Sequence, residues 1–179
     1  MRIDGKDIAR LDVAQLRHLM NTLLIVEANA NAVPLTDLDL TTRETDPDGG
    51  IDAYIVWPPR AKRDPLAAGP IAFQYKSGKL KPKELREEFH KPGIKEVLDS
   101  GGSYVLVVSH DYPKRTRDAR NRQLSELCAE RGIPETKCKI LYGDHIAHWC
   151  SQHLAIMALP ELGKPLRGFM TVEQWRNNA

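Results

Sequence analysis

The sequence lacks the features that mark secreted, membrane-bound or disulfide-stabilised proteins. Its 179 residues include only three cysteines, Cys128, Cys138 and Cys150, and no CxxC pair. An odd number of unpaired thiols argues against a disulfide framework and favours a reducing compartment. The charged start MRIDGKDIAR has no signal-peptide core, and no apolar run approaches the ~20 residues that span a bilayer. We therefore expect a cytoplasmic protein with no membrane association.

Net charge is also scarce, at +2 for the whole chain, but its distribution is uneven. Residues 1–52 carry a net charge of −5, whereas residues 53–179 carry +7. An acidic front and a basic remainder suit a protein that holds a cation and meets a polyanion. Random surface variation explains the asymmetry equally well. Hydrophobic content of 41% and charged content of 28% are ordinary for one globular domain with a substantial core.

The clearest predicted element is a helix over residues 12–31. Asp12 is a good N-cap, and Gln15 stands three residues later, as in a capping box. An apolar stripe then follows, consisting of Leu16, Met20 and Leu23. The next position on this stripe is Glu27, so a carboxylate points toward the core. Its burial costs several kcal/mol unless something compensates the charge.

The remaining pattern predicts an α/β fold. Strands are expected at 38–42, 51–57 and 71–76 (an antiparallel meander) and at 103–109 and 138–143, with helices at 82–100, 113–132 and 144–159, the last capped by Asp144. Three successive strands followed by strands alternating with helices predict one mixed sheet covered on both faces. We assign residues 1–159 to one domain. Residues 160–179 read as a tail that packs by Leu166, Phe169 and Trp175, or that leads to a downstream region.

Polar residues interrupt two of these strands. Gln74 and Lys76 are two residues apart, so they share one face of their strand, and Phe73 and Tyr75 share the other. Asp52 begins the preceding strand, directly after the turn DPDGG. Antiparallel pairing brings it close to Gln74 and Lys76, and the inward glutamate of the first helix can reach the same place.

The pattern DGGID…QYK on consecutive strands, after a helix with an inward glutamate, resembles the PD-(D/E)xK nuclease superfamily. More narrowly, it is similar to the Mrr-like branch, which reads GGID…QxK. It also resembles the N-terminal nuclease effector domains of bacterial anti-phage proteins. The resemblance implies a three-layer α/β/α, restriction-endonuclease-like fold with an αβββαβ core over roughly residues 11–159. The sharp match is confined to residues 48–52 and 73–78.

The resemblance also implies a catalytic set. Asp52 corresponds to the metal-binding aspartate, Gln74 to the second acid and Lys76 to the catalytic lysine, with Mg²⁺ as the metal and Mn²⁺ as a substitute. Glu27 corresponds to the helix glutamate and a third metal ligand, although Glu44 and Asp48 are alternatives. Because an amide brings no negative charge, metal affinity is expected to be lower than in an all-carboxylate site.

These residues lead us to expect a Mg²⁺-dependent endonuclease that cuts double-stranded DNA, as an effector in restriction or anti-phage defence. Basic residues expected to hold phosphates are Lys79, Lys81, Lys83 and Arg86, and a second patch or solvated helix face comprises Arg115, Arg117, Arg120 and Arg122. The expected partners are DNA, further copies of the chain and the remainder of a larger multidomain protein. One alternative is a catalytically weak or inactive module for nucleic-acid binding or assembly. Another is an interaction domain with zinc on His145, His148, Cys150 and His153.

Overall fold

The computed structural model describes residues 3–40, 49–59, 68–153, 156, 159 and 162. In chain order the helices and strands are α1 (Gly5–Ala9), α2 (Val13–Ala30), β1 (Leu38–Leu40), β2 (Ala53–Trp57), β3 (Gly69–Lys76), α3 (Pro82–Phe89), α4 (Pro92–Asp99), β4 (Ser103–Val108), α5 (Lys114–Glu130), β5 (Cys138–Leu141) and α6 (Gly143–Cys150), with short 3₁₀ turns before β1 and β5.

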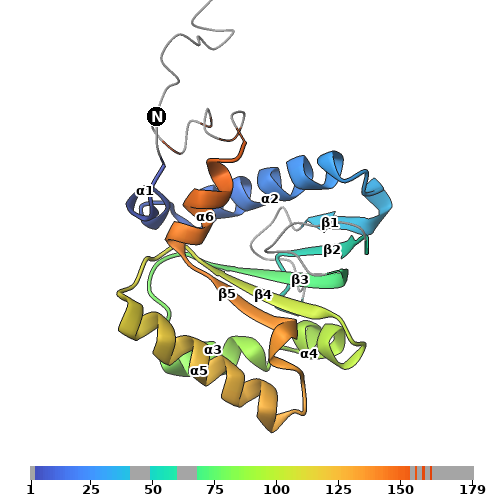
Figure 1. The fold of residues 1–179 in the computed structure, drawn as a ribbon, viewed down its shortest axis with the longest axis vertical. Helices are drawn as coiled ribbons and strands as arrows, with labels where there is room; N and C mark the ends of the chain where they lie inside the picture. The colour runs from blue at the N-terminus through green and yellow to red at the C-terminus, as the bar shows by residue number, and fades with distance from the viewer. Residues whose placement is uncertain are drawn as a thin grey trace, which may run out of the picture.

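The strands form one mixed sheet in the order β1-β2-β3-β4-β5. β1, β2 and β3 are an antiparallel meander, and β4 and β5 continue the sheet in parallel with β3. Helices α1, α2 and α6 cover one face, and α3, α4 and α5 cover the other (Figure 1). The predicted α/β class, the meander and the helices on both faces are therefore confirmed. Among the described residues, no helix has the combination of length and apolarity that crossing a bilayer requires.

Side-chain alternation along β3 divides the core into two clusters. Ile71, Phe73 and Tyr75 pack toward α2, whereas Ala72 packs toward α3 and α4. All six residues of β4 are buried, as its β-branched sequence SYVLVV predicts for a strand covered on both faces. A polar residue on β3 is consequently enclosed by a helical layer whichever face it points to.

Helix α2 begins as its sequence predicts. The Gln15 backbone N–H donates to Asp12 Oδ1 at 2.8 Å, and the Asp12 N–H donates to Gln15 Oε1 at 3.1 Å. The predicted stripe is buried, and Glu27 is only 3% exposed. The inward direction of this glutamate is therefore confirmed.

The prediction of a single helix over 82–100 is wrong, because the structure has two helices there, α3 and α4. Lys91 precedes a proline and is extended, with φ −62° and ψ 143°, and Pro92 then opens α4. The proline ring disfavours the helical conformation in the preceding residue, and it suits the first helical position, where no donor is needed. The break at Lys91 turns α4 toward the start of β2.

The ends of the chain also differ from expectation. The N-cap of α6 is Tyr142 rather than Asp144, and the helix ends at Cys150 in a turn instead of continuing to 159. Helix α1, which was not predicted, is capped by Asp4. The predicted tail falls outside the described residues except for Leu162, which is buried in the core on the α2 side.

The glycines before β2 allow a close approach of two backbones. Gly49 and Gly50 have φ of +63° and +92°, which side chains disfavour. A Cβ on Gly49 would lie 2.8 Å from the backbone N of Gly93, which donates to the Gly49 carbonyl at 3.0 Å. A Cβ on Gly50 would lie 2.2 Å from Cδ of Lys91. The turn before Asp52 is thereby fixed against the first turn of α4.

Candidate functional site

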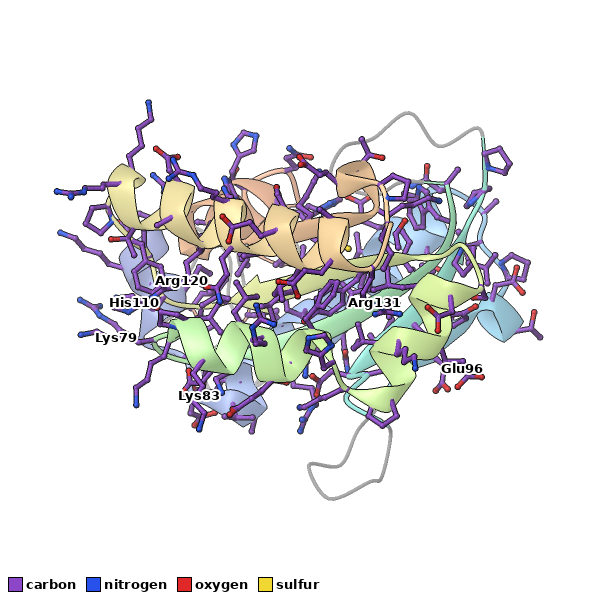
Figure 2. The ribbon with its side chains drawn as sticks, turned by 90° about the horizontal axis from the view of Figure 1, so that it is seen from below. Lys79, Lys83, Glu96, His110, Arg120 and Arg131 are labelled. Carbon is purple, nitrogen blue, oxygen red and sulfur yellow. The ribbon has the colours of Figure 1, made fainter. Side chains whose placement is uncertain are left out.

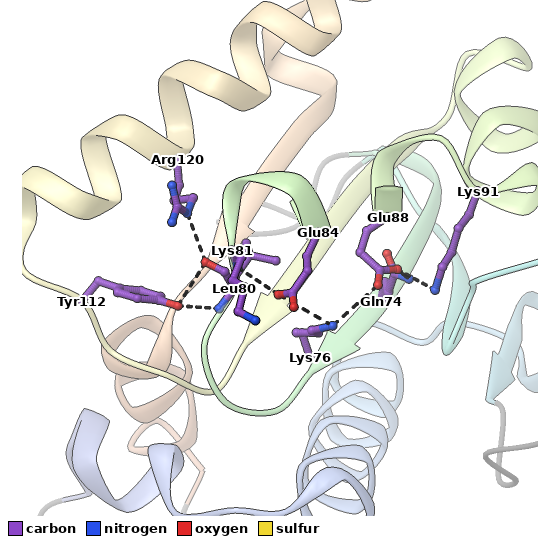
Figure 3. A network of polar contacts seen from close by, with 9 residues as sticks. All are labelled: Gln74, Lys76, Leu80, Lys81, Glu84, Glu88, Lys91, Tyr112 and Arg120. Atoms are coloured by element: carbon purple, nitrogen blue, oxygen red, sulfur yellow. Dashed lines mark hydrogen bonds and ion pairs between the residues drawn. The ribbon is translucent and has the colours of Figure 1, made fainter. Parts of the chain in front are cut away.

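Gln74 and Lys76 share one face of β3, as predicted, but it is α3, and not the first helix with Glu27, that covers this face (Figure 3). Glu88 contacts both: it accepts from Gln74 Nε2, and its Oε1 lies 3.8 Å from Lys76 Nζ. Glu84, one turn earlier on α3, places Oε2 4.0 Å from the same ammonium. Lys91 approaches Glu88 from the other side at 2.5 Å. The result is a chain of alternating charges between the sheet and α3.

The Gln74 amide makes a hydrogen bond at each of its two ends. Its Oε1 accepts from the Tyr104 hydroxyl at 2.7 Å, and its Nε2 donates to Glu88. Burial raises the pKa of Tyr104 well above its usual value, and the negative charge of Glu88 adds to this effect. Tyr104 therefore remains a protonated donor, and the carbonyl of Gln74 faces this hydroxyl within the core.

Asp52 is bound to β3 through both its backbone and its side chain. Its N–H donates to the Phe73 carbonyl at 2.8 Å, and its Oδ2 accepts from the Tyr75 N–H at 2.8 Å. These two bonds bracket Gln74, so the acid and the amide of the motif occupy adjacent strand positions. The other carboxylate oxygen, Oδ1, accepts from Arg17 of α2 at 2.9 Å. Both oxygens of Asp52 are thus occupied, and its third partner lies on the face opposite α3.

Asp52 also affects a neighbouring tyrosine. Burial raises the pKa of Tyr75 well above its usual value, and the charge of Asp52 raises it further. The Tyr75 hydroxyl donates to Asn21 of α2 at 3.1 Å. The α2 side of β3 therefore holds two side-chain hydrogen bonds from α2, Arg17 to Asp52 and Tyr75 to Asn21.

Glu27 has a different environment from the one expected. Its Oε1 accepts from Trp149 Nε1 at 2.8 Å and lies 2.8 Å from His153 Nε2. These two partners belong to α6 and to the turn that follows it, so they join α2 to α6 and compensate the buried charge. The alternatives Glu44 and Asp48 lie outside the described residues.

The described residues do not assemble a metal site as they are folded. No group of three or more histidine, cysteine, aspartate or glutamate side chains among them is arranged to hold an ion. The oxygens of Asp52 are occupied, and the carbonyl of Gln74 faces Tyr104. The residues that resemble Mg²⁺ ligands therefore do not fit a bound ion in this conformation. Three oxygens of Glu84 and Glu88 instead surround the chain's own ammonium groups.

The histidine and cysteine residues near the end of α6 do not form a site either. His153 contacts Glu27, and Cys150 is buried in the core, where burial raises its thiol pKa to about 12. His145 and His148 are exposed. A thiol that stays protonated at neutral pH is a poor zinc ligand.

The four predicted phosphate-binding residues are all exposed, but they differ in their pairing, and Lys83 lies 3.4 Å from Glu87. Lys79, Lys81 and Lys83 are exposed, and Lys79 and Lys83 lie toward the same end of the molecule as His110 and Arg120 (Figure 2). Arg86 instead forms a double hydrogen bond with Glu130, at 3.1 and 3.2 Å.

The second patch on α5 is only partly available for phosphate. Arg117 pairs with Asp144 at 2.6 Å, and Arg120 Nε donates to the Leu80 carbonyl at 3.1 Å. Arg115 and Arg122 are exposed.

Sequence reasoning missed Glu84, Glu88 and Arg17 as members of these networks. Leu85 and Phe89 form the buried side of α3, so Glu84 and Glu88 flank it one turn apart. That periodicity was present in the sequence. The partner of Arg17 depends on the position of α2 over the sheet, which no local pattern contains.

The chain matches no family model, and comparisons with curated proteins and with solved structures find no significant match. The chemistry of the site must therefore be inferred from its own geometry.

Proposed function

We propose that this chain is a metal-dependent endonuclease that hydrolyses DNA, with a restriction-endonuclease-like fold. The order α2-β1-β2-β3, then α3 and α4, then β4 supports the αβββαβ core, with one helix of the core split in two. The observation that carries the proposal is the contact of Asp52 with Phe73 and Tyr75, the neighbours of Gln74. It brings the two strands of the GGID…QxK pattern together at the residues that define the pattern.

The chain's own cations supply the remaining support. Lys76 is 30% exposed at its side chain, so its ammonium lies at the boundary between the buried motif and solvent. Lys79 and Lys81 follow on the exposed connection to α3. A phosphodiester placed over this connection would meet positive charge along its backbone, independently of base sequence. Lys76 would stabilise the negative charge that develops on the phosphate oxygens.

The test is cleavage of supercoiled plasmid in MgCl₂ and in MnCl₂. We expect Lys76→Met to lower the rate about a hundredfold, which corresponds to about 3 kcal/mol of transition-state stabilisation. Lys95→Met is the matched control, because Lys95 is exposed on α4 outside the motif and the basic connection, and its rate should stay within about threefold of the parent. Equal rates for the parent and Lys76→Met would reject the assignment of Lys76.

A second candidate is a module that binds nucleic acid or mediates assembly without cutting. The occupied oxygens of Asp52 favour it, since no ligand set for an ion is preformed. This candidate predicts a gel shift of double-stranded DNA that weakens steeply with salt, and no cleavage in either metal. Both candidates include a role in restriction or anti-phage defence and a place within a larger assembly.

A further inference from the structure

We propose that Arg17 is a built-in counter-ion that occupies Asp52 and must leave before this carboxylate can bind a divalent cation. The inference rests on the proposed function, because it concerns regulation of the same site. The motif predicts a metal-binding acid at Asp52, whereas the structure pairs this acid with Arg17. The proposal accounts for both observations, because the acid is present but the chain's own arginine neutralises it. In this conformation the site is closed.

The geometry of the pair supports exchange at one carboxylate oxygen. Asp52 Oδ2 is fixed by the Tyr75 N–H, so the carboxylate keeps its place whether or not Arg17 is bound. Oδ1 is held by a single nitrogen of Arg17, at 2.9 Å. A carboxylate with one oxygen fixed to the backbone and one oxygen held by a side chain can change partners without a backbone movement.

The guanidinium itself is incompletely satisfied. Nε of Arg17 is buried and has no hydrogen-bond partner within the described part of the chain. Arginine commonly forms two parallel bonds with a carboxylate, and this pair shows one. A buried donor without a partner weakens the case for Arg17 as a purely structural element, because its desolvation is not repaid. Its long side chain can swing to solvent while its stem stays packed.

Charge balance explains why the pair would respond to metal. The side chains of Arg17 and Asp52 are 12% and 13% exposed, so neither charge is well hydrated. Removing Arg17 alone leaves the negative charge of Asp52 uncompensated, and a divalent cation can supply positive charge in its place. The α3 face has a similar arrangement, in which Lys76 and Lys91 occupy Glu88. The chain's own cations thus hold the carboxylates on both sides of the motif.

The experiment measures Mn²⁺ binding to the full chain by electron paramagnetic resonance, without nucleic acid. The variants are Arg17→Gln, Arg17→Lys and the double variant Arg17→Gln/Asp52→Asn, with Arg86→Gln as a control arginine. We expect Arg17→Gln to bind Mn²⁺ at least tenfold more tightly than the parent, Arg17→Lys to fall between them, and the double variant to lose the gain. The melting temperature of Arg17→Gln should be below that of the parent and should rise in MnCl₂.

Three outcomes would overturn the inference. One is unchanged Mn²⁺ affinity in Arg17→Gln that is folded by circular dichroism; if that variant does not fold, unchanged affinity in Arg17→Lys has the same meaning. Another is a gain that persists in the double variant, which would place the ion elsewhere. The last is an equal gain in Arg86→Gln, which would indicate a general charge effect.

The nuclease proposal is separable from this result. A gain in Mn²⁺ affinity with no plasmid cleavage by any variant would support the role of Arg17 and reject the endonuclease. Plasmid cleavage by the parent with no gain in Arg17→Gln would do the reverse.

Discussion

Acidic residues of neighbouring elements lie against both faces of β3 and are largely buried, but their partners differ in exposure. On the α2 face, Asp52 and Glu27 have partners that are themselves buried: the side chains of Arg17 and His153 are 12% and 11% exposed. On the α3 face, Glu88 is 13% exposed, but its cations are not buried: Lys76 and Lys91 are 30% and 40% exposed.

This difference separates contacts that are costly to break from contacts that exchange readily with solvent. A buried partner cannot be replaced by water, so breaking its bond leaves an uncompensated charge. An exposed ammonium returns to solvent at little cost, because water and ions hydrate it there. The α2 face therefore contributes mainly to stability, and an ion can reach Asp52 there only by displacing Arg17. The ammonium groups of the α3 face can yield to a phosphate or an ion at lower cost.

Truncating the acids of the two faces should show the largest contrast. Glu27→Ala leaves the Trp149 N–H and His153 without their buried acceptor, and we expect a loss of about 3–5 kcal/mol in the free energy of unfolding. Glu88→Ala leaves the Gln74 amide without its acceptor, while Lys76 and Lys91 can turn to solvent, and we expect a loss of about 1–2 kcal/mol. Urea denaturation followed by tryptophan fluorescence measures both. Equal losses would remove the distinction between the faces.

The turn of Gly49 and Gly50 before β2 should give the next largest effect on stability. Gly49→Ala forces a side chain at φ +63° against the backbone of Gly93, and we expect a loss of about 2–3 kcal/mol. Gly78→Ala is the matched control, since its φ is +78° and no atom lies within 4 Å of the added Cβ. That variant should lose only about 1–2 kcal/mol. If both variants lose the same amount, contact with α4 does not position the motif.

Double-mutant cycles compare the ion pairs directly. The coupling energy between Arg17 and Asp52 should be about 1–3 kcal/mol, because the two groups are buried and in contact. The coupling between Lys76 and Glu84, which are 4.0 Å apart and 30% and 27% exposed, should stay below about 0.5 kcal/mol. Thermal and urea unfolding of each single and double variant supply the four corners of each cycle. A larger coupling at Lys76 would reverse the assignment of the exchangeable face.

The smallest effect is pH-dependent and belongs to the α3 face. The Lys81 backbone N–H lowers the pKa of Glu84, and the positive charge of Lys76 acts in the same direction. A folded pKa below the unfolded value stabilises the protein above the unfolded pKa, and this contribution is lost as pH falls through the folded pKa. We expect Glu84→Gln to be less stable than the parent at pH 7 by under about 1 kcal/mol. The two proteins should be equally stable at a pH low enough to protonate the Glu84 carboxyl of the parent in both the folded and the unfolded state. A pH series of melting temperatures measures the difference. A gap that is constant with pH would exclude a charge effect.

The sequence predicted most elements because their signals are local. The capping box at Asp12, the apolar stripe ending at Glu27 and the β-branched strand SYVLVV can each be recognised within one short segment of the sequence. The break at Lys91 was also readable from Pro92, but the longer helical pattern outweighed it. Helix α1 was missed because five residues carry too little periodicity to be distinguished from a turn.

The site was less predictable because its contacts join distant segments. The shared face of Gln74 and Lys76 follows from the strand period alone, and it was predicted correctly. The partners of Asp52 and Glu27 depend on how α2 and α6 lie over the sheet, and the two acids bind different elements as a result. Strand alternation fixes a side chain's direction, but only tertiary packing decides what it meets.

The hydrogen bond from Gly93 to the Gly49 carbonyl has a mechanical consequence. It ties the segment that leads into Asp52 to the helix start that carries Lys91, so displacement of either one pulls on the other. A ligand that displaced Asp52 would therefore also displace Lys91 from Glu88. Ligand binding on the α2 side of the sheet would in this way alter the ion pairs on the α3 side.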